Sequence, residues 1–111
     1  MPTRLRRPIG EILRDRSDAR RAFLRPQIER ALAEMRRNGV VCEVIGSFAR
    51  TGEMVDAASD LDVLVERKGA LTEGDIWDIA WTYLTDVDVD LVFADHLPPR
   101  KAALMKEHAR G

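Results

Sequence analysis

Cysteine is nearly absent from this sequence, since Cys42 is the single one in 111 residues. One cysteine excludes an internal disulfide, as is typical of proteins of a reducing compartment, and we therefore expect a cytoplasmic location. Cys42 lies in an apolar segment rich in β-branched residues. We expect a buried structural thiol there rather than a reactive one.

Long hydrophobic runs are also missing. No apolar stretch approaches the roughly 20 residues of a membrane-spanning helix, and the arginine-rich start lacks the apolar core of a signal peptide. We therefore expect no membrane association. With 45% hydrophobic and 33% charged residues, the composition is that of a globular protein, and 111 residues suffice for one domain with a modest core.

A net charge of −1 conceals an uneven distribution of charge. Residues 1–37 hold eleven arginines and five acidic residues, a net charge of +6, whereas residues 38–111 hold seven basic and fourteen acidic residues, a net charge of −7. The basic segment suits nucleic acid or an acidic partner. Its arginines alternate with Glu and Asp, however, so a solvated helix face is the interpretation that we favour.

The apolar spacing predicts helices separated by short strands. Pro26 marks either a kink or the first turn of a new helix, and the Asn38–Gly39 pair predicts a helix end. Helices are expected over residues 9–24, over 26–37, briefly from 48, from 73 behind a cap at Thr72, and from 98. Strands are expected over residues 40–45, 61–66 and 87–93.

This order predicts an α/β domain with a small mixed β-sheet and helices packed mainly on one face. We expect residues 1–24 to form a basic N-terminal helical extension and residues 25–111 to form the domain proper.

Two aspartates stand two residues apart at the second predicted strand. Because alternate residues of a strand point the same way, Asp60 and Asp62 are expected on one face. Like charges so close repel unless a cation lies between them, which indicates a metal. The third predicted strand repeats the alternation with Asp88 and Asp90. Three converging carboxylates are a donor set suited to Mg²⁺ and to a triphosphate.

A Gly-Ser pair ends the first predicted strand. Gly46 has no side chain and lets the backbone approach a ligand closely. Ser47 and the amides of the following turn would lie at a helix N-terminus, where backbone N–H groups receive phosphate oxygens.

These elements together resemble a known family. The chain has GSFAR at residues 46–50, SDLDV at 59–63 and VDLV at 89–92. In this order they resemble the minimal nucleotidyltransferase (MNT) domain of the DNA polymerase β superfamily, over about residues 25–110. The resemblance implies the palm-like nucleotidyltransferase fold, ATP as substrate, two Mg²⁺ ions and transfer of AMP to a hydroxyl group.

Many small members of this family are antitoxins that adenylylate a HEPN-domain toxin. The resemblance therefore implies a HEPN-type partner protein, and a domain this small leads us to expect a homo- or hetero-oligomer. It also implies site residues: metal ligands and catalytic groups Asp60, Asp62 and Asp90, and nucleotide-binding residues Gly46, Ser47, Arg50 and Ser59. We prefer Asp90 to Asp88 because Asp-Leu-Val follows it, as in the family.

Two alternatives remain open. Thr51 stands where the family usually has glycine, and the loop to Ser59 is about two residues longer than usual. These departures favour an antitoxin that neutralises its toxin by contact, with weak or no catalysis. The basic residues 1–37 favour, as a further alternative, a nucleotidyltransferase that acts on RNA.

Overall fold

Helices and strands alternate along the chain. The computed structural model describes residues 7–50 and 52–110, and this part forms three α-helices and three β-strands. The helices are α1 (Ile9–Arg37), α2 (Glu73–Tyr83) and α3 (Pro99–Arg110). The strands are β1 (Val41–Ile45), β2 (Leu61–Arg67) and β3 (Val89–Phe93). Short 3-10 turns follow β1 (η1, Gly46–Phe48) and β3 (η2, Ala94–His96), and the predicted α/β class is confirmed.

The three strands form one mixed sheet in the order β1-β2-β3. β1 and β2 are antiparallel, whereas β2 and β3 are parallel and are joined by the crossover helix α2. Side chains of a strand alternate between the two faces, so Leu61, Val63 and Val65 share one face. Asp62 lies between two of them in sequence and belongs to the other face.

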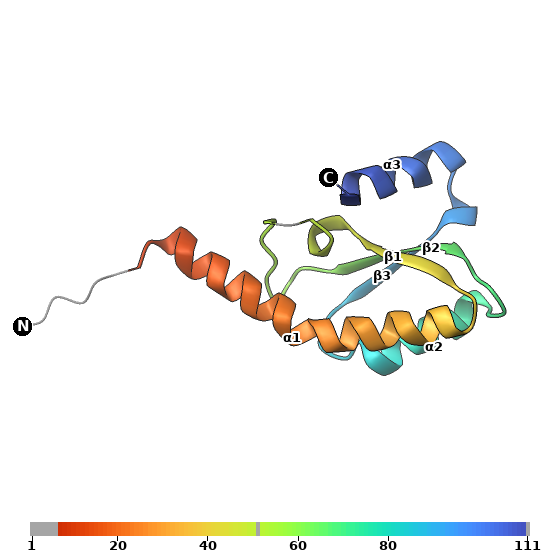
Figure 1. Cartoon of the computed structure of the whole chain (residues 1–111), viewed down its shortest axis with the longest axis horizontal. Coiled ribbons are helices and arrows are strands. Elements are labelled where there is room, and N and C mark those ends of the chain that lie inside the picture. The colour runs from red at the N-terminus through yellow and green to blue at the C-terminus, as the bar shows by residue number, and fades with distance from the viewer. Residues whose placement is uncertain (1–6, 51, 111) are drawn as a thin grey trace, which may run out of the picture.

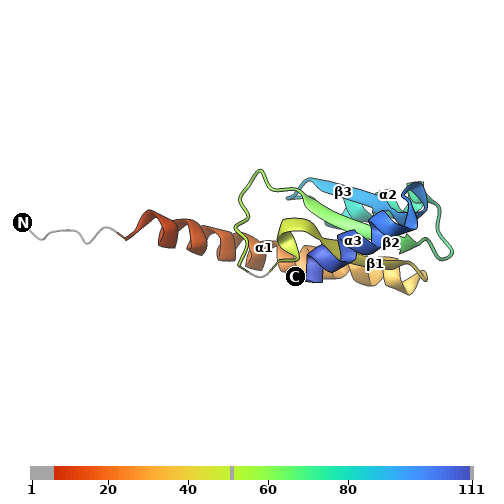
Figure 2. The same cartoon turned by 90° about the horizontal axis from the view of Figure 1, so that it is seen from above.

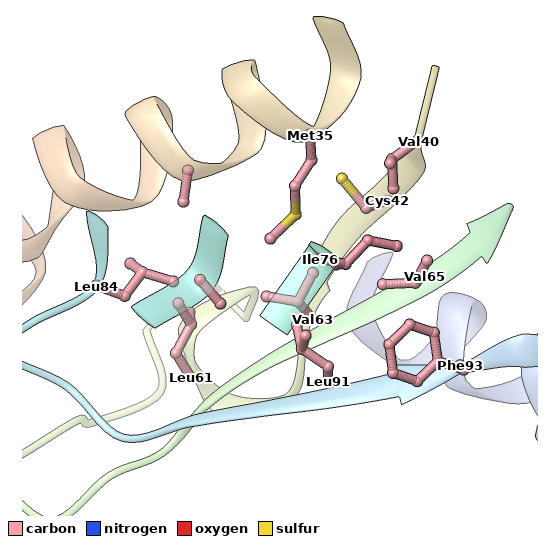
Figure 3. Packing of buried hydrophobic residues seen from close by; sticks show 12 residues of the cluster. Met35, Val40, Cys42, Leu61, Val63, Val65, Ile76, Leu84, Leu91 and Phe93 are labelled. Carbon is pink, nitrogen blue, oxygen red and sulfur yellow. The ribbon is translucent and has the colours of Figure 1, made fainter. Parts of the chain in front are cut away.

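The hydrophobic core lies between the sheet and the pair α1 and α2 (Figures 1 and 3). Met35, Leu61 and Ile76 from three different elements are fully buried there. Burying one such side chain contributes about 1.5–3 kcal/mol. Cys42 is buried in the same core as predicted, and this burial raises the pKa of its thiol.

Helix α3 crosses the opposite face of the sheet (Figures 1 and 2). Its Lys106 forms an ion pair with Glu66 of β2, and its Nζ atom lies 3.9 Å from Glu43 Oε1 of β1. The helices therefore cover both faces: α1 and α2 pack on the apolar face, and α3 meets a face that carries acidic residues.

Helix α1 is continuous through Pro26, which is one of the two arrangements expected from the sequence. Its axis changes direction in the middle part, as expected of a helix that contains proline (Figure 1). It ends before Gly39, whose φ is +81°. The boundary expected after residue 24 lies inside this helix, where Leu24 is fully buried.

Two other local predictions have different outcomes. The cap predicted at Thr72 is confirmed, since Thr72 and Asp75 form a reciprocal capping box at the start of α2. Strand β3 begins at Val89 and not at Val87, because β2 begins only at Leu61, the pairing partner of Val89. None of the described helices combines the length and apolar character that crossing a bilayer requires.

Replacing Gly69 by alanine should destabilise the fold by about 2–4 kcal/mol. Gly69 has φ +60°, and an added Cβ would lie 2.4 Å from the carbonyl carbon of Gly39 and 2.5 Å from the carbonyl oxygen of Asn38. Chemical denaturation measures the loss. Gly74→Ala is the control, because a Cβ added at Gly74 would lie 3.8 Å from its nearest neighbour, Thr72 Oγ1. An equal loss of stability in both variants would contradict the packing argument.

Candidate metal and nucleotide site

Two of the predicted carboxylates lie side by side on neighbouring strands. In the parallel pair β2–β3, Asp62 is the direct partner of Asp90. Directly paired residues point to the same face, so both project from the face opposite the α1–α2 layer. On its other side, Asp62 pairs with Ile45, the last residue of β1, and this brings the end of β1 to the same place.

Gly46 packs directly against the Asp62 carboxylate. The backbone of Gly46 has φ +72°, and a Cβ added there would lie 2.6 Å from Asp62 Oδ2. The left-handed conformation favours glycine, and an added Cβ would displace the Asp62 carboxylate. The Gly-Ser turn predicted to accompany the aspartates thus reaches the Asp62 side chain.

The pKa of Asp62 is raised by its surroundings. Burial raises the pKa of the Asp62 carboxyl, and the negative charges of Asp90 and Asp60 raise that pKa further. Asp90, rather than Asp88, is the carboxylate near the β3 strand that acts on Asp62 in this way. Negative charge is therefore concentrated around Asp62, as a cation site requires.

The raised pKa has a consequence for stability. The metal-free folded protein holds the Asp62 proton more tightly than the unfolded chain, so this contribution to stability is complete below the ordinary aspartate pKa of about 4 and is lost as pH rises through the folded pKa. As pH rises from about 4 to 7 we expect wild type to lose stability relative to Asp62→Asn, and to melt at a lower temperature than this variant at pH 7. Thermal melts in EDTA measure this difference. A wild type whose stability rises relative to the variant over this pH range would contradict the prediction.

Asp60 and Asp88 each precede the first residue of a strand. Asp60 is exposed just before β2, and Asp88 is exposed just before β3, where its carbonyl accepts a hydrogen bond from the Leu61 amide at 2.8 Å. The carboxylates of Asp60, Asp62 and Asp90 are neighbours, yet their donor atoms do not all fall within 4.8 Å of one another.

A tighter group of donor atoms lies elsewhere. Among the described residues, Glu73, Asp95 and His96 bring one ligand atom each to within 4.8 Å of the others. Lys68 already occupies this cluster, since its Nζ lies 2.9 Å from Glu73 Oε2 and 2.8 Å from Asp95 Oδ2. The ammonium group neutralises the carboxylates, and we interpret the cluster as an ion-pair network. His96 is exposed, and no sequence motif indicated this network.

The residues predicted to bind nucleotide are held within the loop between β1 and β2. Arg50 forms an exposed ion pair with Glu53 at 3.0 Å, and the Ser59 hydroxyl accepts a hydrogen bond from the Asp56 amide at 3.0 Å. Ser47 lies half-buried in η1. Thr51, where the sequence departs from the family pattern, lies outside the described residues.

The short helix predicted from Phe48 is wrong. The chain makes one 3-10 turn over Gly46–Phe48, closed by a hydrogen bond from the Ala49 amide to the Gly46 carbonyl at 3.0 Å. The helix does not continue, because the guanidinium of Arg21 takes the next carbonyls as acceptors. The helix N-terminus expected behind Ser47 is therefore replaced by a single turn.

Two cavities flank the sheet, and the three aspartates line neither. One of about 290 Å³ lies on the α1 side, since Arg21, Arg25 and Ile28 of α1 form part of its wall. The other, of about 460 Å³, lies beside α3. Asp60 and Asp90 are exposed to solvent, whereas Asp62 is half-buried. Comparisons of the chain with models of protein families, with curated proteins and with solved structures found no match.

Proposed function

We propose that this chain is a Mg²⁺-dependent nucleotidyltransferase of the minimal type, which transfers AMP from ATP to a hydroxyl group of a HEPN-type partner protein. The observation that carries the proposal is the pairing of Asp62 with Asp90 on adjacent parallel strands, with Gly46 against the Asp62 carboxylate. The polymerase β palm-like fold belongs to the same proposal, since the short mixed sheet and the motif order are compatible with it.

The donor set fits a hard divalent cation. Asp60, Asp62 and Asp90 offer only carboxylate oxygens, which are the ligands that Mg²⁺ prefers. Burial raises the pKa of Asp62, and the charges of Asp90 and Asp60 raise it further; a bound cation would offset the repulsion among these carboxylates. When bound, Mg²⁺ would neutralise phosphate charge and favour deprotonation of the acceptor hydroxyl.

The proposed reaction assigns a separate task to each part of the site. The oxygen of the acceptor hydroxyl forms a bond to the α-phosphorus of ATP, the bond from that phosphorus to the oxygen bridging to the β-phosphate breaks, and pyrophosphate leaves. Asp90 is exposed at the outer strand and assists removal of the hydroxyl proton. The backbone at Gly46 and Ser47 provides the surface against which the triphosphate lies.

The partner is proposed from the exposure of two of the three carboxylates. Asp60 and Asp90 are exposed to solvent, so a second protein would supply the wall around the acceptor. Large apolar side chains elsewhere on the surface, among them Phe23 and Trp81, suit protein contact.

Mass spectrometry of a co-expressed HEPN-type partner tests the proposal. An added AMP on the partner that requires ATP, Mg²⁺ and intact Asp62 is the expected result. A partner that carries no AMP after co-expression with the wild-type chain would contradict catalysis.

The contact-only antitoxin is the second candidate, and the exposed apolar residues favour it independently of the carboxylates. Phe23 is 56% exposed and Trp81 is 62% exposed. If the Asp60→Asn/Asp62→Asn variant binds and inhibits its partner as wild type does, contact alone suffices. Loss of inhibition in that variant would favour catalysis.

A further inference from the structure

Helix α1 forms several hydrogen bonds with the loop that follows β1. The guanidinium of Arg21 donates hydrogen bonds to the carbonyls of Phe48 at 2.7 Å and Ser47 at 2.8 Å, and also to those of Arg50 at 3.2 Å and Glu53 at 2.5 Å. One side chain therefore gathers four carbonyls of a single loop. Its cationic carbon also lies 5.8 Å from the centre of the Phe48 ring.

A second contact from the same helix holds the far part of this loop. The Ser17 hydroxyl accepts a hydrogen bond from the Val55 amide at 2.9 Å, and Ser17 is only 2% exposed. Ser17 lies seven residues before the buried Leu24, so both side chains are on the inner face of α1. A buried serine with a backbone partner indicates a specific contact rather than a solvated polar residue.

The same stretch of α1 also holds the loop before β3. Arg20 donates a hydrogen bond to the Asp86 carbonyl at 2.5 Å, and the Gln27 side-chain amide donates one to Asp86 Oδ2 at 2.6 Å. The loop leading to Asp60 and the loop leading to Asp90 are thus both attached to one helix. The helix lies on the other side of the sheet from the carboxylates and does not touch them.

We propose that α1 acts as a brace for the site and that Arg21 is its positioning residue. By fixing the carbonyls of residues 47, 48, 50 and 53, Arg21 holds the turn that places Gly46 against Asp62. This role for nucleotide binding rests on the proposed function; the hold on the loop does not. Arginine is needed because its planar fork serves several acceptors at once, whereas lysine presents a single ammonium group.

Arg21→Lys is the test, with Arg16→Lys as the matched control. Arg16 is exposed on the same helix and has no hydrogen bond or ion pair within residues 7–50 and 52–110. In Arg21→Lys we expect amide hydrogen exchange over residues 47–55 to become at least tenfold faster, while exchange in β2 and β3 is unchanged. We also expect the KM for ATP to rise about tenfold with kcat changed much less. Ser17→Ala should speed exchange mainly at Val55.

The two measurements separate two failures. Unchanged loop exchange in Arg21→Lys would overturn the brace, whether or not wild type binds ATP. Faster loop exchange in a protein whose wild type does not bind Mg²⁺-ATP would support the brace and contradict the proposed function. Faster loop exchange with an unchanged KM would overturn the positioning role toward nucleotide.

Discussion

The Asp60→Asn/Asp62→Asn variant is expected to lose at least about a thousandfold in AMP transfer, since removing metal ligands forfeits roughly 4 kcal/mol of charge stabilisation in the transition state. It should also lose Mg²⁺-dependent binding of ATP. The fold should remain, because the substitutions remove repulsion around a partly buried carboxylate whose pKa is already raised. Calorimetric titration with Mg²⁺-ATP and a thermal melt measure the two effects on the same sample.

Asp88→Asn is the matched control for this variant. Asp88 is an exposed aspartate at the entrance to β3 and precedes Asp90 by two residues. We expect Asp88→Asn to keep at least about half of the wild-type transfer rate. The transfer rate of Asp90→Asn should fall as far as that of Asp62→Asn. Asp88→Asn falling as far as Asp90→Asn would contradict the choice of Asp90.

Replacing Gly46 by alanine is expected to damage both the fold and the site. The left-handed backbone alone should cost about 1–2 kcal/mol. In addition, the new Cβ would lie 2.6 Å from Asp62 Oδ2, so the carboxylate must move away from its position beside Asp90. We expect a total loss of about 2–4 kcal/mol and a loss of Mg²⁺-ATP affinity of tenfold or more.

Gly52→Ala separates these two causes. Gly52 also has a positive φ, +84°, but an added Cβ meets no atom within 4 Å. This variant should show only the backbone cost of about 1–2 kcal/mol and should keep the affinity for Mg²⁺-ATP. If Gly52→Ala and Gly46→Ala lose affinity equally, close packing at Asp62 is not the cause.

The alternation of apolar and polar residues in the strands predicted one part of the site, namely the face on which Asp62 and Asp90 lie. Period-two alternation in β2 and β3 places Asp62 and Asp90 on the face opposite the core, because Val63 and Leu91 are core residues. The register that makes Asp62 the partner of Asp90 is a contact between distant segments, which local alternation does not specify.

Side-chain contacts across the fold account for what sequence reasoning missed. Ser17 and Arg21 stand among charged residues that resemble a solvated helix face, and their partners lie between 26 and 38 residues further along the chain. The helical spacing from Ser17 to Leu24 was the one available signal. The helix predicted from Phe48 was wrong for a similar reason, since the carbonyls of Phe48 and Arg50 accept hydrogen bonds from the distant Arg21.

Binding of Mn²⁺, as a paramagnetic substitute for Mg²⁺, is the direct test of a cation site at Asp62 and Asp90. In an ¹⁵N-labelled sample we expect selective broadening of the amide signals of Gly46, Asp62 and Asp90, and we expect this broadening to be lost in Asp62→Asn. Broadening centred on Glu73, Asp95 and His96, or no selective broadening at all, would contradict a cation site at the paired aspartates.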